Sequence, residues 1–478
     1  MARVVLVSCV TACSSGATQR DVGIALEPCR IAGSDRVAQC GALERPVDPS
    51  AASGPMIAVR VAVFPARQGA RRRPVYFFAG GPGQAATEAF GPLLGVFDDL
   101  GRDRDLVLVD QRGTGSSAPL DCTLPDDDIP LADKLRGDVE LGILDECLAS
   151  YEHDPRLFVT SIAVQDLDAV REALGHEQID LVGGSYGTRA AMVYARAFGA
   201  NVGRVVLDGV APVDMALPSS FGVDGQAALD RMFADCAADP GCAAAFPDAE
   251  VKLDHWLTGL KDTPMRTVIE DPRTGERERV ELGAQEIALL LRGVLYVPTL
   301  AAVLPLTLSL AEAGDIGPLV AQGLVLGDSI DETFSYGMFL SVVCAEDVPF
   351  IDEAAAAAND ATFLGRGYVE LVRRSCAKWP AATLERGYRD PIALEHPTLV
   401  LSGELDPVTP PRWGEHVIGN LRAGRHIVVP GSGHGTMTVP CVTNMIQTFL
   451  DGSDTLEIGC LGDSTRPAFF IDRAGPPA

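Results

Sequence analysis

Basic side chains are scarce in this sequence of 478 residues, which has 39 Lys and Arg against 65 Asp and Glu and a net charge of −26. Nucleic-acid binding draws on positive charge that neutralises phosphates, so this balance argues against a nucleic-acid partner. Long apolar runs are also missing, because no stretch approaches the about 18 apolar residues of a membrane-spanning helix. With 47% hydrophobic and 22% charged residues, the composition is that of a globular protein. The length of the chain suggests two or three domains.

The cysteines lack the spacing of a metal site. No C-x-x-C pair occurs among the twelve, and His is scarce near them, which argues against zinc. Ten of them form five couples of near neighbours in the sequence, which suggests five disulfides, although sequence alone leaves the connectivity open. The couples are Cys29 and Cys40, Cys122 and Cys147, Cys236 and Cys242, Cys344 and Cys376, and Cys441 and Cys460. Such a number of disulfides predicts an extracytoplasmic protein.

Residues 1–13 have the layout of a secretory signal, with Arg3 ahead of a short apolar run. The run Val10-Thr11-Ala12-Cys13 resembles the lipobox of bacterial lipoproteins. That resemblance implies removal of Cys9 with the signal segment, lipidation of Cys13 and a membrane-tethered protein in the periplasm or at the cell surface of a bacterial-type cell. Simple cleavage and secretion, a buried strand over Val4–Cys13 and a true start further upstream are the alternatives.

The segment Gln178–Phe198 is the most informative part of the chain. An apolar run, Ile179–Val182, precedes Gly183-Gly184-Ser185-Tyr186-Gly187, and an Ala-rich helical run follows. A strand, a G-x-S-x-G motif and a helix in succession are the context of a nucleophile elbow, in which the serine has strained backbone angles and glycines avoid collisions. Ser185 is therefore the candidate nucleophile, at a helix N-terminus that favours developing negative charge. An ordinary strand-to-helix turn is the alternative.

Two further loops follow predicted buried strands. Pro74–Phe78 leads into Ala79-Gly80-Gly81-Pro82-Gly83, where glycine lets a backbone N–H approach a substrate oxygen. We assign the two oxyanion donors to the N–H groups of Gly81 and Tyr186; a simple tight turn is the alternative for this loop. Leu106–Val109 leads into DQRGTGSS, residues 110–117. There we expect Arg112 to pair with Asp110 or a neighbouring loop carboxylate and to brace the rim of the site.

The motifs GGPG (80–83), DQRGTGSS (110–117) and GGSYG (183–187), in this order, resemble the proline iminopeptidase and tripeptidyl aminopeptidase group of α/β hydrolases. Ala79 stands where many iminopeptidases have His, which favours the secreted tripeptidyl-type branch. The resemblance implies an α/β-hydrolase fold with a mostly parallel central sheet. Core residues 29–212 and 395–465, the latter with a disulfide segment at its end, would flank an inserted, mainly helical cap over residues 213–394.

The orienting acid and the base are expected late in the chain. Thr398–Leu401 reads as a strand, and the G-x-x-D-x-x-T-P pattern after it contains Asp406. His434 lies in a Gly-rich loop after the last predicted strand. The order Ser185, Asp406, His434 is that of α/β hydrolases. Asp208 and Glu404 are the alternatives to Asp406.

The resemblance implies a serine exopeptidase that removes tripeptides, or single residues such as Pro, from peptides with a free N-terminus. It implies an acyl-enzyme and no metal or other cofactor, with Glu346 and Asp347 as candidates that bind the substrate ammonium group. A carboxylesterase or lipase with the same triad is the alternative. The sequence gives no indication of the oligomeric state.

Overall fold

The computed structural model describes residues 23–51, 53–122, 130–136, 139–331 and 334–476. The predicted signal segment with Cys9 and Cys13 lies outside these ranges. None of the helices in the described ranges has the length and apolar character needed to cross a bilayer.

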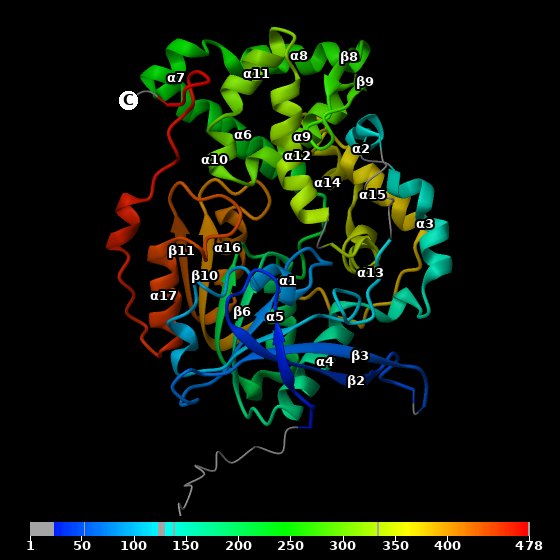
Figure 1. Ribbon diagram of the computed structural model, residues 1–478, viewed down its shortest axis with the longest axis vertical. Coiled ribbons are helices and arrows are strands. Elements are labelled where there is room, and N and C mark those ends of the chain that lie inside the picture. Colours follow the sequence, from blue (N-terminus) through cyan, green and yellow to red (C-terminus); the bar gives the residue numbers. More distant parts are fainter. Residues whose placement is uncertain (1–22, 52, 123–129, 137–138, 332–333, 477–478) are drawn as a thin grey trace, which may run out of the picture.

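A nine-stranded sheet forms the lower half of the molecule in Figure 1, with the strand order β1-β2-β3-β5-β4-β6-β7-β10-β11. Its strands are β1 Glu27–Arg30, β2 Val37–Pro46, β3 Met56–Phe64, β4 Val75–Phe78, β5 Leu106–Val109, β6 Ile179–Gly184, β7 Val202–Asp208, β10 Leu394–Gly403 and β11 Leu421–Val429. The first three strands pair antiparallel, and every pair from β5 to β11 is parallel. Parallel strands end at one common edge, so the loops that follow them are brought together there. The predicted α/β-hydrolase sheet is confirmed.

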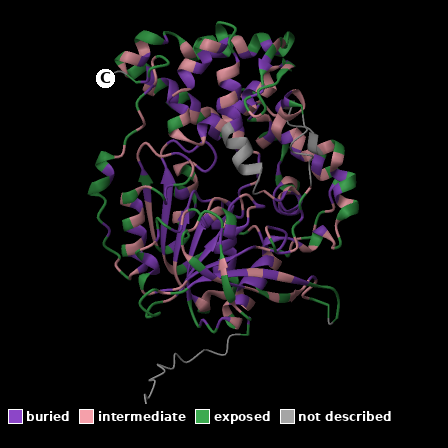
Figure 2. Ribbon diagram, viewed as in Figure 1, coloured by how far each residue is buried: buried purple, intermediate pink, exposed green. Residues whose placement is uncertain are grey.

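Helices cover both faces of the parallel strands, which explains why these strands are continuous apolar runs. In β4, Tyr76 and Phe78 pack into the core cluster that contains α4 (Thr160–Ala173) and α5 (Tyr186–Phe198). Val75 and Phe77 face the other way, into the cluster with α1 (Ala86–Phe90) and α17 (Pro440–Leu450). Figure 2 shows the strands of this sheet as buried between the helices.

The chain between β7 and β10 builds a helical cap at the end of the sheet (Figure 1). None of its described residues joins the nine-stranded sheet. Its helices are α6 Phe221–Ala238, α7 Pro240–Ala245, α8 Ala249–Asp262, α9 Ala284–Leu295, α10 Pro298–Ala301, α11 Leu304–Glu312, α12 Gly317–Asp331, α13 Tyr336–Glu346, α14 Glu353–Ala357 and α15 Gly367–Lys378. The cap has its own apolar core and a hairpin, β8 (Met265–Glu270) with β9 (Arg277–Leu282), that the sequence analysis did not anticipate.

Two segments from outside the expected cap boundaries also join the cap. Helix α2 (Leu131–Arg136) buries Leu131 and Leu135 in the cap core, and the Leu131 N–H donates to the Glu278 carboxylate at 2.9 Å. At the other end of the chain, residues 464–476 form what we call the C-terminal strap, which follows the short helix η6 (Gly459–Asp463) and rises to the cap (Figure 1). Phe469 of the strap is 4% exposed in the cap core, and Arg466 pairs with Asp235 of α6 at 2.8 Å. The cap is thus held to the core at several points.

All five expected disulfides are present, in the expected pairings. The bridge between Cys29 and Cys40 joins β1 to β2, and the bridge between Cys344 and Cys376 joins α13 to α15. Each bridge joins cysteines 32 residues apart or fewer, so each restricts the unfolded chain only locally.

Candidate active site

Ser185 occupies the sharp turn between β6 and α5. Its φ of 54° and ψ of −127° are unusual for a residue with a side chain. A Cβ atom at position 187 would overlap the carbonyl oxygen of Phe78, and one at position 183 would lie 2.6 Å from the carbonyl oxygen of Gly187. Both glycines of the motif are therefore required by space, and the turn projects Ser185 beyond the end of the strand.

The glycine-rich loop after β4 lies directly against the serine. A Cβ atom at Gly80 would be 3.2 Å from the Cβ of Ser185, and Gly81 has a φ of 105°, which only glycine adopts readily. Within the described part of the chain, the N–H groups of Gly81 and Tyr186 donate to no protein acceptor. Two backbone donors near the serine thus remain available to a substrate oxygen.

His434 and Asp406 form a hydrogen-bonded pair on the loops after β11 and β10. The distance from His434 Nδ1 to Asp406 Oδ2 is 2.9 Å. Asp406 is 2% exposed, and its other oxygen, Oδ1, accepts the N–H groups of Val408 and Thr409 at 2.8 and 2.9 Å. The Thr409 hydroxyl donates to Asp406 Oδ2 at 2.8 Å. The carboxylate is therefore held in one orientation, with Oδ2 turned to the imidazole.

Mutual attraction sets the protonation of this pair. Burial by itself would lower the pKa of His434, but the charge of Asp406 and its hydrogen bond outweigh burial, so the pKa is raised above its ordinary value. Burial would likewise raise the pKa of Asp406, yet His434 and the two backbone N–H donors bring that pKa below its usual range. Asp406 is thus ionised, and His434 is more basic than a free imidazole.

Asp208 and Glu404, the two alternatives to Asp406, form other hydrogen bonds. Asp208 accepts the N–H groups of Thr436 and Met437 at 2.6 and 2.9 Å, and its carbonyl oxygen accepts the Ser185 N–H at 2.9 Å. It therefore ties the nucleophile turn to the loop that carries His434. Glu404 accepts the Gly431 N–H and pairs with an arginine of α6. Among the described residues neither carboxylate is hydrogen bonded to His434.

Comparisons with known proteins support the fold. Residues 73–243 match a family model described as alpha/beta hydrolase fold, and residues 361–456 match one described as TAP-like protein. The chain is an α/β hydrolase. Serine protease Hip1 of Mycobacterium tuberculosis H37Rv is 29% identical over 463 residues, which cover 87% of this chain and 86% of that protein.

Two further similarities were found. Tripeptidyl aminopeptidase of Streptomyces coelicolor is 25% identical over 484 residues, which cover 90% of this chain and 84% of that protein. The crystal structure of proline iminopeptidase from Mycobacterium smegmatis aligns with a TM-score of 0.43 and 17% identity, and the alignment covers 86% of this chain and 97% of that chain.

Glu346 and Asp347 do not lie where the sequence analysis of this α/β hydrolase placed them. Both are 0% exposed. Glu346 accepts the N–H and the hydroxyl of Thr160 at 2.8 and 3.0 Å and the Tyr388 hydroxyl at 2.5 Å, while Asp347 forms a two-pronged pair with Arg189. Their oxygens are occupied by protein donors, so the predicted contact with a substrate ammonium group is replaced by a buried network.

This buried network reaches the nucleophile turn. The Thr160 hydroxyl, which contacts Glu346, is also 2.6 Å from the hydroxyl of Tyr186, the residue after Ser185. Burial raises the pKa of Glu346 above its usual range, and the charge of Arg189 only partly offsets this. The network therefore holds the first turn of α5 in place through the hydroxyl of Tyr186.

The arginine expected at the rim is also internal. Arg112 is 0% exposed and pairs with Asp166 of α4 at 2.7 Å. Asp110 accepts the N–H and the hydroxyl of Thr87 instead. The predicted partner, Asp110 or a neighbouring loop carboxylate, is therefore wrong, because the carboxylate comes from a helix 54 residues further along the chain.

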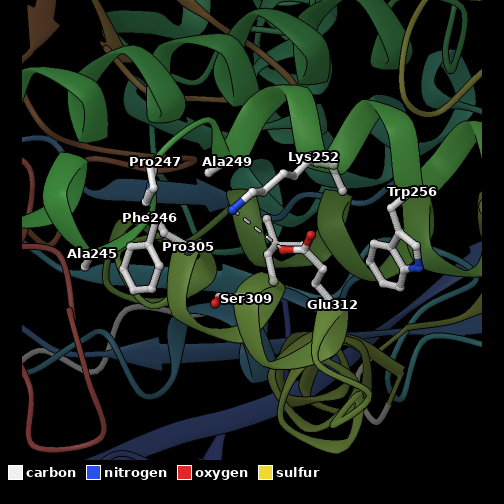
Figure 3. Close-up of a pocket in the computed structure, with 11 residues that line it drawn as sticks. Ala245, Phe246, Pro247, Ala249, Lys252, Trp256, Pro305, Ser309 and Glu312 are labelled. Carbon is white, nitrogen blue, oxygen red and sulfur yellow. Dashed lines mark ion pairs between the residues drawn. The ribbon is translucent and has the colours of Figure 1, made fainter.

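The cap contributes a residue that sequence reasoning missed. The carbonyl oxygen of Tyr296 accepts the backbone N–H of His434 at 3.1 Å, and the two rings meet edge-on with centroids 5.3 Å apart. No sequence motif marks Tyr296, because its role depends on where the cap folds over the sheet. The pocket in Figure 3 is a different feature, since α7, α8, α11 and the residues around them line it and no triad residue does.

Proposed function

We propose that this hydrolase is a serine exopeptidase that releases N-terminal residues from peptides through an acyl-enzyme, with Ser185 as nucleophile, His434 as base and Asp406 as orienting acid. The observation that carries the proposal is the His434–Asp406 hydrogen bond on loops tied through Asp208 to the strained Ser185 turn. The peptidase names of the two curated relatives support the reaction class.

The steps follow from the hydrogen bonds. Because Asp406 accepts the proton on Nδ1, the unprotonated nitrogen of neutral His434 is Nε2, which takes the proton of Ser185 as its oxygen attacks the scissile carbonyl. The Gly81 and Tyr186 N–H groups stabilise the oxyanion, a contribution of about 3–4 kcal/mol for each donor. His434 then protonates the leaving amine, and water attacks the acyl-enzyme by the same route.

The substrates are peptides with a free N-terminus, from which the enzyme removes a tripeptide or a single residue. The five disulfides support a location outside the cytoplasm, because such bonds persist in oxidising compartments. A lipid anchor at Cys13 belongs to the same proposal.

A panel of chromogenic amides tests the reaction and the requirement for a free N-terminus. Tripeptidyl and single-residue p-nitroanilides, each with a free or an acetylated N-terminus, would be assayed with the wild-type protein and with Ser185→Ala. We expect turnover of a free-amine amide, little turnover of its acetylated partner and none by the variant. Cleavage of p-nitrophenyl esters without cleavage of any amide would replace the proposal with a carboxylesterase, and equal turnover by Ser185→Ala would refute the nucleophile.

A further inference from the structure

A cationic side chain of the cap lies beside the candidate catalytic histidine. Arg292 is in the last turn of α9 and donates through Nη2 to the Tyr296 hydroxyl at 2.6 Å. Tyr296 is the residue whose ring and carbonyl oxygen contact His434. Tyr296 therefore contacts both the guanidinium of Arg292 and the imidazole of His434. A single side chain separates Arg292 from the proposed catalytic base.

Aromatic rings hold this guanidinium in place. Its Cζ atom is 4.7 Å from the ring centroid of Phe221, 5.2 Å from that of Tyr296 and 5.1 Å from that of Tyr368. Phe221 and Tyr368 are themselves stacked, with centroids 6.1 Å apart and an angle of 18° between the rings. Rings from α6, α15 and the end of α9 thus orient the charge by cation–π contact without neutralising it.

The three arginines that are almost fully buried in this structure have acidic partners. Arg104 pairs with Asp180, Arg112 with Asp166 and Arg189 with Asp347. Arg292, by contrast, is half-buried, and among the described residues its guanidinium donates to the Tyr296 hydroxyl and forms no ion pair with a carboxylate. A positive charge that is held among aromatic rings, with no carboxylate partner in the described part of the chain, can attract a negative group of a bound substrate.

We propose that Arg292 binds a carboxylate of the substrate and so selects acidic or short peptides. The planar guanidinium suits the two oxygens of a carboxylate, and its remaining N–H groups supply the donors. The carboxylate comes from an Asp or Glu side chain of the acyl residue or from the C-terminus of a short peptide. This inference rests on the proposed function, because it assigns the specificity of that same site.

Matched substrate pairs separate the two sources. One pair is a tripeptidyl p-nitroanilide with Glu or Gln as the acyl residue, and the other is a tetrapeptide with a free or an amidated C-terminus. For Arg292→Gln we expect kcat/KM for the acidic member of one pair to fall about tenfold to a hundredfold, as for a lost hydrogen bond to a charged group. The neutral member should change less than about threefold, and Arg292→Lys should retain part of the difference.

The control is Arg266→Gln, which removes an exposed arginine of the cap hairpin that pairs with Glu281. This control should leave kcat/KM unchanged for all four substrates of the two pairs. Equal losses on acidic and neutral members of both pairs would overturn the inference and leave Arg292 with the role of holding the cap helices together.

Two additions keep the test decisive. If Arg292→Gln unfolds, the wild-type enzyme is used instead. Uncleavable analogues of the same two pairs, without the chromophore or with the scissile bond replaced, are then compared as inhibitors. Tighter inhibition by the acidic member of one pair by about tenfold or more is then expected, and equal inhibition constants would refute the proposal. If the wild type cleaves only esters, the peptidase function falls, while p-nitrophenyl esters of Glu and Gln still measure the effect of Arg292.

Discussion

Asp406→Asn is the substitution for which the structure predicts the largest effect from the smallest change. The Val408 and Thr409 N–H groups donate to Oδ1, so the oxygen of the introduced amide will occupy that position. The amide NH₂ then replaces Oδ2 and faces His434 Nδ1. Because NH₂ is a donor, Nδ1 must become the acceptor, and the proton moves to Nε2. The imidazole is then in the tautomer that cannot take a proton from Ser185.

The expected loss follows from that tautomer. The imidazolium also loses the adjacent negative charge that raises the pKa of His434. The same exchange in the Ser-His-Asp triad described for serine proteases lowers kcat by about 10⁴. That factor corresponds to about 5.5 kcal/mol of activation free energy. The backbone hydrogen bonds to the side chain are retained, but the Thr409 hydroxyl loses Oδ2 as its acceptor, so we expect the free energy of unfolding to fall by about 1 kcal/mol.

The assay is kcat on a free-amine p-nitroanilide, with thermal unfolding measured alongside. Glu404→Gln is the matched control, since this neighbouring carboxylate accepts the Gly431 N–H and does not contact His434, and an amide oxygen can keep that bond. It should change kcat less than about tenfold. An Asp406→Asn enzyme within tenfold of wild type would refute the assignment of the acid and the tautomer argument with it.

Four further outcomes are expected. Because neutral His434 is the base and its pKa is raised, kcat/KM should fall as the pH is lowered through a midpoint above the ordinary value of about 6.5; a midpoint below about 6 would contradict this. Glu346→Ala should lower the free energy of unfolding by about 3 kcal/mol in urea, because buried donors lose their acceptor. Glu346→Gln should leave KM for free-amine peptides unchanged, whereas a tenfold rise with unchanged stability would restore a substrate role. Truncation after Asp463 removes the C-terminal strap with its Phe469 anchor, so limited proteolysis should cut the cap faster; an unchanged cleavage rate would show that the strap does not hold it.

Elements whose signal is local could be predicted from the sequence. The strand Leu106–Val109 has the expected bounds, since an apolar run involves only near neighbours. The five disulfides join cysteines at most 32 residues apart, so the couples were visible along the chain. The elbow at Ser185 was equally accessible, because its glycines and its strained turn lie within one short motif.

The charged interior could not be predicted in this way. Glu346 and Arg112 were expected near the surface of the site, yet each is buried against a partner far away in sequence, Thr160 and Asp166 respectively. A buried charge is tolerated only where chain crossings bring donors to it, and an acidic residue in a sequence does not reveal whether such donors are present.

By itself, the sequence determined the α/β order of the core, the disulfide couples and the three residues proposed for the triad, because motif spacing and strand endings are properties of short segments. Only the tertiary structure decided that Tyr296 contacts His434, that Arg292 stands beside it within aromatic rings and that the C-terminal strap reaches the cap. These contacts join segments that are far apart in the sequence. Their geometry depends on how the whole cap packs over the sheet, for which no local pattern carries a signal.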